Sequence, residues 1–245
     1  LTPYSTRYFS EEDDPLFSYN PLWDFSDTHS GQEPTATFVT GALPDQSSDV
    51  KTLELASLMS FYRHPIQYFF QKRMQVWFRD EETPLEDEEP FAIDPLDDYA
   101  LRKGLLSTVV QGRSLKAYSD YLRASGNLPV GKAGDLILKR RIHDIETLYE
   151  KLQPLMEGEA QREEIRVQLG EHLLEGWVGQ RYAGGFLRYD VAKVSGRHRF
   201  TTWVQHLACC AAGYQERTLY RGLSEAFAFR AIPATEARQQ LLALV

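Results

Sequence analysis

In the first two-thirds of the chain, apolar residues recur at the spacing of helices. A first helix is expected to begin at Ser48 or Asp49, since both residue types are good N-caps. A second helix is expected from Pro65, and the pair Asp94–Pro95 supplies the cap and first position of a third. The pattern therefore predicts that this part of the chain is rich in helices.

Two further helices and one short strand are expected in the same part of the chain. Residues 114–126 predict a helix that stops at Gly126, because glycine readily ends helices. After the loop 127–134, a long helix is expected to run to about Gln153. The apolar segment QVWF at 75–78 predicts a short strand.

After the long helix, the apolar period changes from 3.6 to 2, which is typical of strands. The predicted elements are, in order, a strand through Ile165, Val167 and Leu169, strands in 172–182 and 185–193, a helix over 200–211, strands over 218–222 and 226–232, and a closing helix over 234–245. A three-strand β-meander with flanking helices indicates an α+β fold.

The first 49 residues differ from the rest, because they mix aromatic residues with Pro, Ser and Asp and show no sustained period. We expect an irregular, aromatic-rich N-terminal arm over 1–49 and one α+β domain over 50–245. No basic-then-apolar leader stands at the start of the sequence. The first residue is Leu1 and not Met, so a fragment of a longer polypeptide is expected. No apolar run approaches the roughly 20 residues that span a bilayer, and a cytoplasmic protein without a membrane partner is expected.

The net charge of −8 is unevenly distributed. Residues 1–100 hold 20 acidic and 6 basic side chains, whereas residues 101–245 hold 15 acidic and 21 basic ones. The basic second part leaves room for a surface that faces nucleic-acid phosphates. The candidate DNA-binding residues lie in two basic runs: Lys139, Arg140, Arg141, Arg197 and Arg199. Ordinary solvent-exposed charge is the alternative interpretation of both runs.

The order of three strands, a helix and a strand is also the core of restriction-type and RecB-type nucleases. Their magnesium site needs an acid on the second strand and an acid-x-Lys pair on the third, because alternate residues of a strand share a face. Here Gly179 stands near the first position, and the third strand carries Arg188 and Asp190 with the charges reversed. These three positions therefore predict a degenerate catalytic site with no metal, and no cofactor is expected.

An active site assembled from other carboxylates is the alternative. Asp190 and Lys193 are three residues apart and would lie on opposite faces of a regular strand. Glu175 shares a face with Gly179 but lies about 13 Å away along a strand. A magnesium-dependent nuclease using Glu175, Asp190 and Lys193 would need a bulge to bring them together.

Five segments together resemble the C-terminal nuclease-like domain of RecC, the gamma chain of exodeoxyribonuclease V. They are HPIQYFFQKRMQVWF (64–78), EPFAIDPLDDY (89–99), GNLPVGKAG (126–134), GWVGQRYAGGFLRY (176–189) and WVQHLACCAAG (203–213). Their order and spacing make the resemblance specific over about residues 50–230.

The resemblance implies a nuclease fold, related to the active domain of RecB, that has lost its catalytic residues. It also implies RecB and RecD as partner subunits, with a duplex DNA end and its separated strands as the nucleic acid. Such a domain carries a pin that helps to part the duplex, expected within Met156–Glu164 or a strand turn nearby.

The sequence thus predicts a non-catalytic DNA-handling and subunit-docking domain of the RecBCD helicase–nuclease, which acts in recombinational repair. An active magnesium-dependent nuclease and a pure protein-interaction scaffold are the alternatives.

Overall fold

The computed structural model describes residues 5–9, 15–18, 41, 51–77, 92–126 and 128–245. The chain divides into two compact units, residues 1–48 and 49–245. In the first unit, the described residues include the 3₁₀ helix η1 (Thr6–Phe9), and the amide of Ser18 donates to the carbonyl of Tyr8. Most of the predicted aromatic arm lies outside the described residues.

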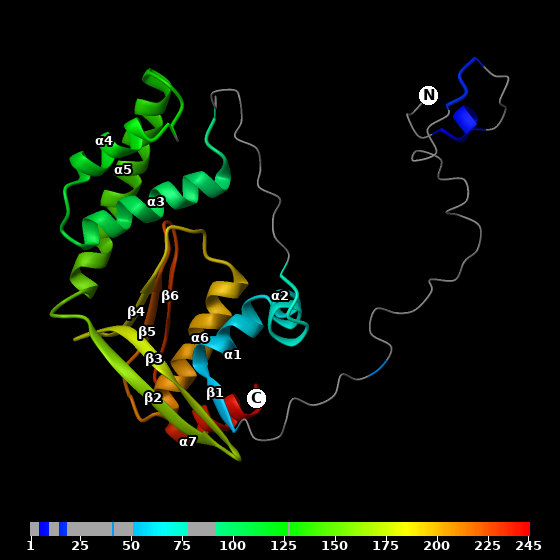
Figure 1. Ribbon diagram of the computed structural model, residues 1–245. Coiled ribbons are helices and arrows are strands. Elements are labelled where there is room, and N and C mark those ends of the chain that lie inside the picture. Colours follow the sequence, from blue (N-terminus) through cyan, green and yellow to red (C-terminus); the bar gives the residue numbers. More distant parts are fainter. Residues whose placement is uncertain (1–4, 10–14, 19–40, 42–50, 78–91, 127) are drawn as a thin grey trace. The chain divides into compact units, whose positions relative to one another are not determined.

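A mixed six-stranded sheet forms the centre of the second unit (Figure 1). Its strands are β1 (Thr52–Glu54), β2 (Gln161–Leu169), β3 (His172–Tyr182), β4 (Gly185–Tyr189), β5 (Thr218–Arg221) and β6 (Ala226–Phe229). The strands β2, β3 and β4 form the expected antiparallel meander, and β5 pairs antiparallel with β6. The strand β1 runs parallel to β3, and β4 runs parallel to β5. The sheet and its flanking helices confirm the α+β class.

The turn between β3 and β4 depends on Gly185. Its φ of +112° lies in a region that L side chains rarely adopt, and a Cβ there would lie 2.4 Å from the carbonyl oxygen of Arg217. The glycine therefore allows β4 to begin directly beside the residue that precedes β5.

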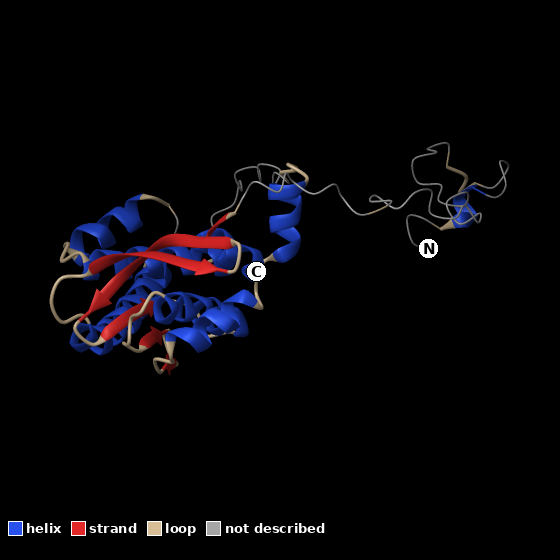
Figure 2. Ribbon diagram, turned by 90° about the horizontal axis from the view of Figure 1, so that it is seen from below, coloured by secondary structure: helices blue, strands red, loops and turns tan. Residues whose placement is uncertain are grey.

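Helices cover both faces of the sheet (Figure 2). One core joins the sheet to α1 (Leu55–Arg63), α6 (Gly196–Ala211) and α7 (Ala234–Leu242). The other joins it to α3 (Pro95–Val110), α4 (Leu115–Ala124) and α5 (Lys132–Leu152). Phe186 and Leu187 are neighbours on β4 and belong to different cores, because successive strand residues point to opposite faces.

Two of the helix-start signals read from the sequence, Pro65 and the pair Asp94–Pro95, are confirmed. The His64 Nδ1 accepts from the amide of Gln67 at 3.1 Å at the start of α2 (Pro65–Tyr68). The Asp94 carboxylate accepts from the amide of Leu96 at 2.7 Å at the start of α3. Side-chain acceptors of this kind satisfy amides that a helix leaves without intrahelical partners.

Two predictions for the segment 48–78 are wrong in their details. The first helix begins at Leu55, and the residues before it form β1, whose Leu53 pairs with Leu174 of β3. Over 75–77 no strand forms, because the π-helical segment η4 (Phe69–Arg73) ends in a turn in which Gln75 has a φ of +55°.

The strand ends of the second half also need correction. The strand β2 begins at Gln161, so the proposed pin segment Met156–Glu164 is irregular only in its first part, where the 3₁₀ helix η5 (Gln153–Leu155) leads into it. The strand expected over 185–193 ends at Tyr189, and the one expected over 226–232 ends at Phe229. In the first case, the Asp190 side chain accepts from the amide of Val191 at 2.7 Å.

Candidate functional site

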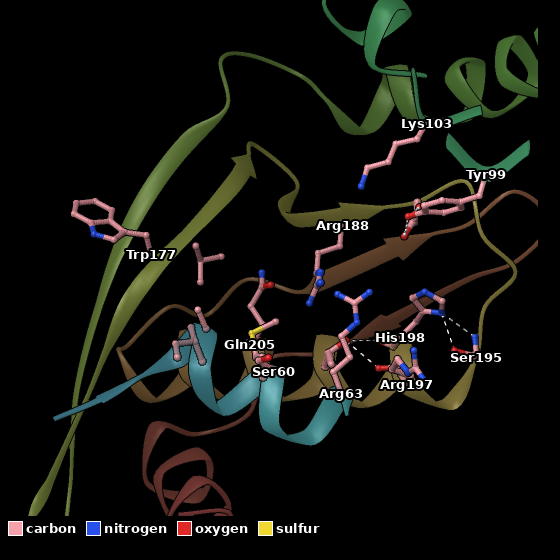
Figure 3. A pocket seen from close by; sticks show the side chains of 16 residues that line it. Ser60, Arg63, Tyr99, Lys103, Trp177, Arg188, Ser195, Arg197, His198 and Gln205 are labelled. Atoms are coloured by element: carbon pink, nitrogen blue, oxygen red, sulfur yellow. Dashed lines mark hydrogen bonds between the residues drawn. The ribbon is translucent and has the colours of Figure 1, made fainter. Parts of the chain in front are cut away.

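A cavity of about 510 Å³ lies where β3 and β4 separate. The two strands pair only through Arg181–Phe186 and Tyr182–Gly185, next to the turn that joins them. Farther along, the space between them is lined by β3, β4, α1, α3 and α6 (Figure 3). We call it the Arg188 cavity, after the side chain that β4 contributes.

Four cationic side chains line the Arg188 cavity from four different elements. Arg63 ends α1, Lys103 lies on α3, Arg188 lies on β4, and Arg197 lies in the first turn of α6. Among the described residues that line the cavity, Asp190 is the one carboxylate. The ion pairs within the described ranges include none of these four cations. The cavity is therefore strongly positive.

Arg188 is the most enclosed of the four cations. Its Nη1 atom is buried and has no hydrogen-bond partner in the described part of the chain. Burial lowers the pKa of Arg188 below its usual value, and the charge of Arg63 acts in the same direction, while Asp190 and Tyr220 oppose the change. A buried donor without a partner costs free energy, so an acceptor supplied from outside the chain would stabilise this side chain.

Asp190 is held in place by donors of the protein. Its carboxylate accepts from the Tyr99 hydroxyl at 3.1 Å and from the amide of Val191 at 2.7 Å. Burial and the nearby Asp190 charge raise the pKa of Tyr99, which keeps the phenol protonated as a donor. The carboxylate thus fastens α3 to the end of β4.

The start of α6 forms another wall of the cavity. The amide of Ser195 donates to His198 Nδ1 at 3.1 Å, an arrangement that needs an unprotonated Nδ1. Burial lowers the pKa of His198, with the charges of Arg188, Arg197 and Arg63 adding to the effect and Asp190 opposing it. The helix dipole adds positive potential at this end of α6.

The five predicted DNA-binding residues do not come together. Arg197 lines the cavity, whereas Arg199 pairs with Glu225 at 3.6 Å. Arg141 contacts two carboxylates: those of Asp98 at 2.5 Å and of Asp144 at 3.5 Å. Lys139 and Arg140 are exposed on α5, away from the residues that line the cavity.

Of the three predicted degenerate positions, Arg188 and Asp190 line the cavity and Gly179 does not. Gly179 is exposed, and a Cβ atom built there would meet nothing within 4 Å.

The side chains of the alternative nuclease site are also separated. Glu175 lies outside the cavity, within 4.0 Å of Arg166 Nη2, and Lys193 is exposed outside it. Among the described residues, no three His, Cys, Asp or Glu side chains are grouped as metal ligands. Glu175, Asp190 and Lys193 therefore do not fit a shared magnesium ion.

Arg63 and Lys103 were not expected in the site. Arg63 is the one basic residue of α1, and Lys103 follows Arg102 in α3; neither belongs to the two basic runs or to a recognised motif. Only the packing of α1 and α3 against the sheet brings them to Arg188. Among the helices that the structure describes, none is both long and apolar enough to cross a membrane.

Comparisons with known proteins agree with the motifs. RecC of Escherichia coli strain K12, a RecBCD enzyme subunit, is 29% identical over 163 residues, which cover 66% of this chain and 14% of the relative. RecC of Mycolicibacterium smegmatis is 25% identical over 181 residues, covering 74% of this chain and 16% of that protein. RecC of Buchnera aphidicola from Acyrthosiphon pisum is 23% identical over 194 residues, covering 78% and 18%. The chain thus spans less than a fifth of the length of these relatives.

The match to the family as a whole is more extensive. Residues 50–245, which contain every strand of the sheet and the whole of the Arg188 cavity, match the RecC C-terminal domain. The chain therefore belongs to the RecC C-terminal domain family.

Proposed function

We propose that this chain is a non-catalytic DNA-handling and subunit-docking domain of a RecBCD helicase–nuclease. In this proposal its core is restriction-endonuclease-like, with a degenerate catalytic site. The meander β2–β3–β4, followed by α6 and the parallel strand β5, supports that assignment because it has the order of a nuclease core.

The observation that carries the proposal is the reversed charge on β4. In a nuclease of this plan, an acid and a lysine two residues apart would face the scissile phosphate. Here Arg188 stands at the acidic position and Asp190 at the basic one, and the Asp190 carboxylate accepts from Tyr99. A guanidinium repels a divalent cation but attracts a phosphate, so the cavity is suited to hold DNA rather than cleave it.

The proposed partners are the RecB and RecD subunits, together with a duplex end and its separated strands. The chain covers 14% of the Escherichia coli RecC relative, so these partners are proposed for this domain within a larger assembly in the cytoplasm. The pin is proposed within Met156–Glu164 or a strand turn nearby; residues 157–160, which are exposed ahead of β2, support the first location.

A cleavage assay tests the absence of catalysis. The chain is incubated with linear duplex and single-stranded DNA in Mg²⁺ or Mn²⁺, and Asp190→Ala serves as the control. We expect no metal-dependent products from either protein. Cutting that requires metal and disappears in Asp190→Ala would overturn the proposal.

A second candidate function, a pure protein-interaction scaffold, is favoured by apolar side chains exposed around α1 and α2. Phe61 is 40% exposed, Ile66 67% and Trp77 65%. Charge reversal at Arg197 and Arg199 separates the two functions, since under the scaffold function the affinity for forked DNA should not change. Co-purification with RecB tests the docking role that both functions share.

A further inference from the structure

We propose that the Arg188 cavity binds one phosphodiester group of a single nucleic-acid strand, and that Arg188 is its central donor. This inference rests on the proposed function and deepens it by naming the bound group and the residues that hold it.

The charge of the cavity is the first reason. Four cations face one carboxylate, and that carboxylate already accepts hydrogen bonds from Tyr99 and Val191. In Figure 3 the side chains of Arg63, Lys103 and Arg188 extend from three elements into a common space. Cations collected this way repel one another, and an anion between them would convert that repulsion into attraction.

The unsatisfied donor of Arg188 is the second reason. A guanidinium matches two oxygens of a phosphate with two parallel N–H groups, and the buried Nη1 atom has no partner among the residues that the structure describes. A phosphate oxygen at this position would supply the missing acceptor and offset part of the desolvation of the cation. The N-terminal turn of α6, which carries Arg197, adds its dipole to the same site.

The third reason is that other arginines of the domain do have acidic partners. Arg102, Arg141 and Arg181 are partly buried, and each lies within an ion pair. The fold thus provides carboxylates for enclosed guanidinium groups at these three positions. Among the described residues it provides none for Arg188, nor for Arg221, whose Nε is also buried without a partner but which does not line the cavity. A missing partner at a cavity wall is what a binding site for an external anion requires.

The shape of the site favours a single strand over a duplex. Arg188 is recessed between β3 and β4, where the backbone of a flexible strand can enter more readily than that of a rigid double helix.

The test uses the 245-residue chain and fluorescence anisotropy of a labelled oligothymidylate at low salt. We expect Arg188→Gln to weaken binding about tenfold, the scale of one charge-assisted hydrogen bond. The slope of log affinity against log salt should fall by about 0.7, the value for one phosphate contact on a single strand. Arg188→Lys, which keeps the charge, should retain part of the affinity.

Arg123→Gln is the matched control. Arg123 lies on α4, outside the cavity, and pairs with Asp120 and Asp135. Its replacement should leave the affinity unchanged. Thermal unfolding of all variants identifies any loss of affinity that comes from misfolding, and Arg188→Lys decides the result if Arg188→Gln does not fold.

Three outcomes would overturn the inference: unchanged affinity in Arg188→Gln, equal affinity for duplex and single strand, or equally tight binding of an acidic peptide. If wild type binds forked DNA and Arg188→Gln binds it equally well, the cavity assignment fails while the proposed function stands. If wild type binds no DNA at low salt, the DNA-handling role fails as well. A thermal-unfolding experiment with inorganic phosphate tests anion binding in the cavity independently of DNA. Phosphate should raise the melting temperature of wild type but not of Arg188→Gln.

Discussion

Two arginines on neighbouring strands of the sheet have opposite surroundings. Arg181 near the end of β3 contacts Glu163 at 2.8 Å and also pairs with Glu216. Its guanidinium lies 5.1 Å from the ring centroid of Tyr214, whose hydroxyl donates to Glu163 at 2.8 Å. We call these four residues the Arg181 cluster. Arg188 on β4 has no ion pair and a buried Nη1 without a partner.

The pKa values of the two side chains move in opposite directions. Hydrogen bonds to Glu216 and Glu163 raise the pKa of Arg181, whereas burial lowers that of Arg188. The fold therefore stabilises the charged form of Arg181, whereas burial of Arg188 disfavours its charged form and reduces the stability of the folded protein. The comparison teaches that partly buried charges of one type can serve structure at one position and binding at another.

The largest expected effect is on the Arg181 cluster. Arg181→Met removes charge-assisted hydrogen bonds and leaves Glu163 and Glu216 facing each other, so the free energy of unfolding should fall by about 2 kcal/mol. Urea denaturation followed by circular dichroism measures the change. Arg166→Met is the control, because the side chain of Arg166 is 62% exposed and its ion pairs are 4.0 Å long, which predicts a loss below about 0.5 kcal/mol. Equal losses in the two variants would remove the distinction.

At Arg188 the free energy of unfolding should change in the opposite direction. Arg188→Met replaces an unpaired, enclosed cation by an apolar side chain of similar length, so the free energy of unfolding should rise by about 1 kcal/mol in phosphate-free, low-salt buffer. The same denaturation experiment measures it. Added phosphate should reduce the gain, because it stabilises only the wild type. A loss of stability in Arg188→Met would show that the arginine supports the fold.

Local sequence signals were enough for most elements of the fold. At His64 and Asp94 the capping side chain accepts a hydrogen bond from an amide two or three residues later. Contacts over so short a distance in the sequence can be predicted from the sequence alone. The strand β1 could not be predicted, since its three residues are a strand only because β3 pairs with them. The register of that pairing is set by segments far apart in the sequence.

The candidate site was predictable only in part. Arg188 and Asp190 lie two residues apart, and the alternation of a strand placed them at one site. Arg63 and Lys103 reach that site through helix packing, which no spacing in the sequence encodes. Conversely, Arg141 pairs with Asp98 of α3 and Arg199 with Glu225 between β5 and β6, both far away in the sequence, so basic runs alone could not distinguish paired cations from free ones.

A smaller effect on stability is expected when the pH is lowered. Hydrogen bonds from Arg181 and Tyr214 lower the pKa of Glu163 below its ordinary value of 4.5. A carboxylate with a lowered folded pKa stabilises the protein above its unfolded pKa, and that contribution is lost as pH falls through the folded value. The stability difference between wild type and Arg181→Met should therefore be constant near neutral pH and shrink below about pH 4.5. Urea denaturation at a series of pH values measures it, and a difference that grows on acidification would contradict the assignment.

The smallest effect is expected beside the Arg188 cavity. A Cβ at Gly179 meets nothing within 4 Å, so Gly179→Asp should fold normally. It adds a carboxylate one position beyond Val178, which lines the cavity, but on the opposite face of β3. The added charge should weaken oligothymidylate binding by about twofold through a screened interaction, while the nearly isosteric Gly179→Asn should leave it unchanged. Anisotropy titrations measure both variants. Gly179→Asp should also remain inactive with Mg²⁺, because Arg188 still repels the ion; metal-dependent cleavage in this variant would mean that the cavity lacks only one ligand of a nuclease site.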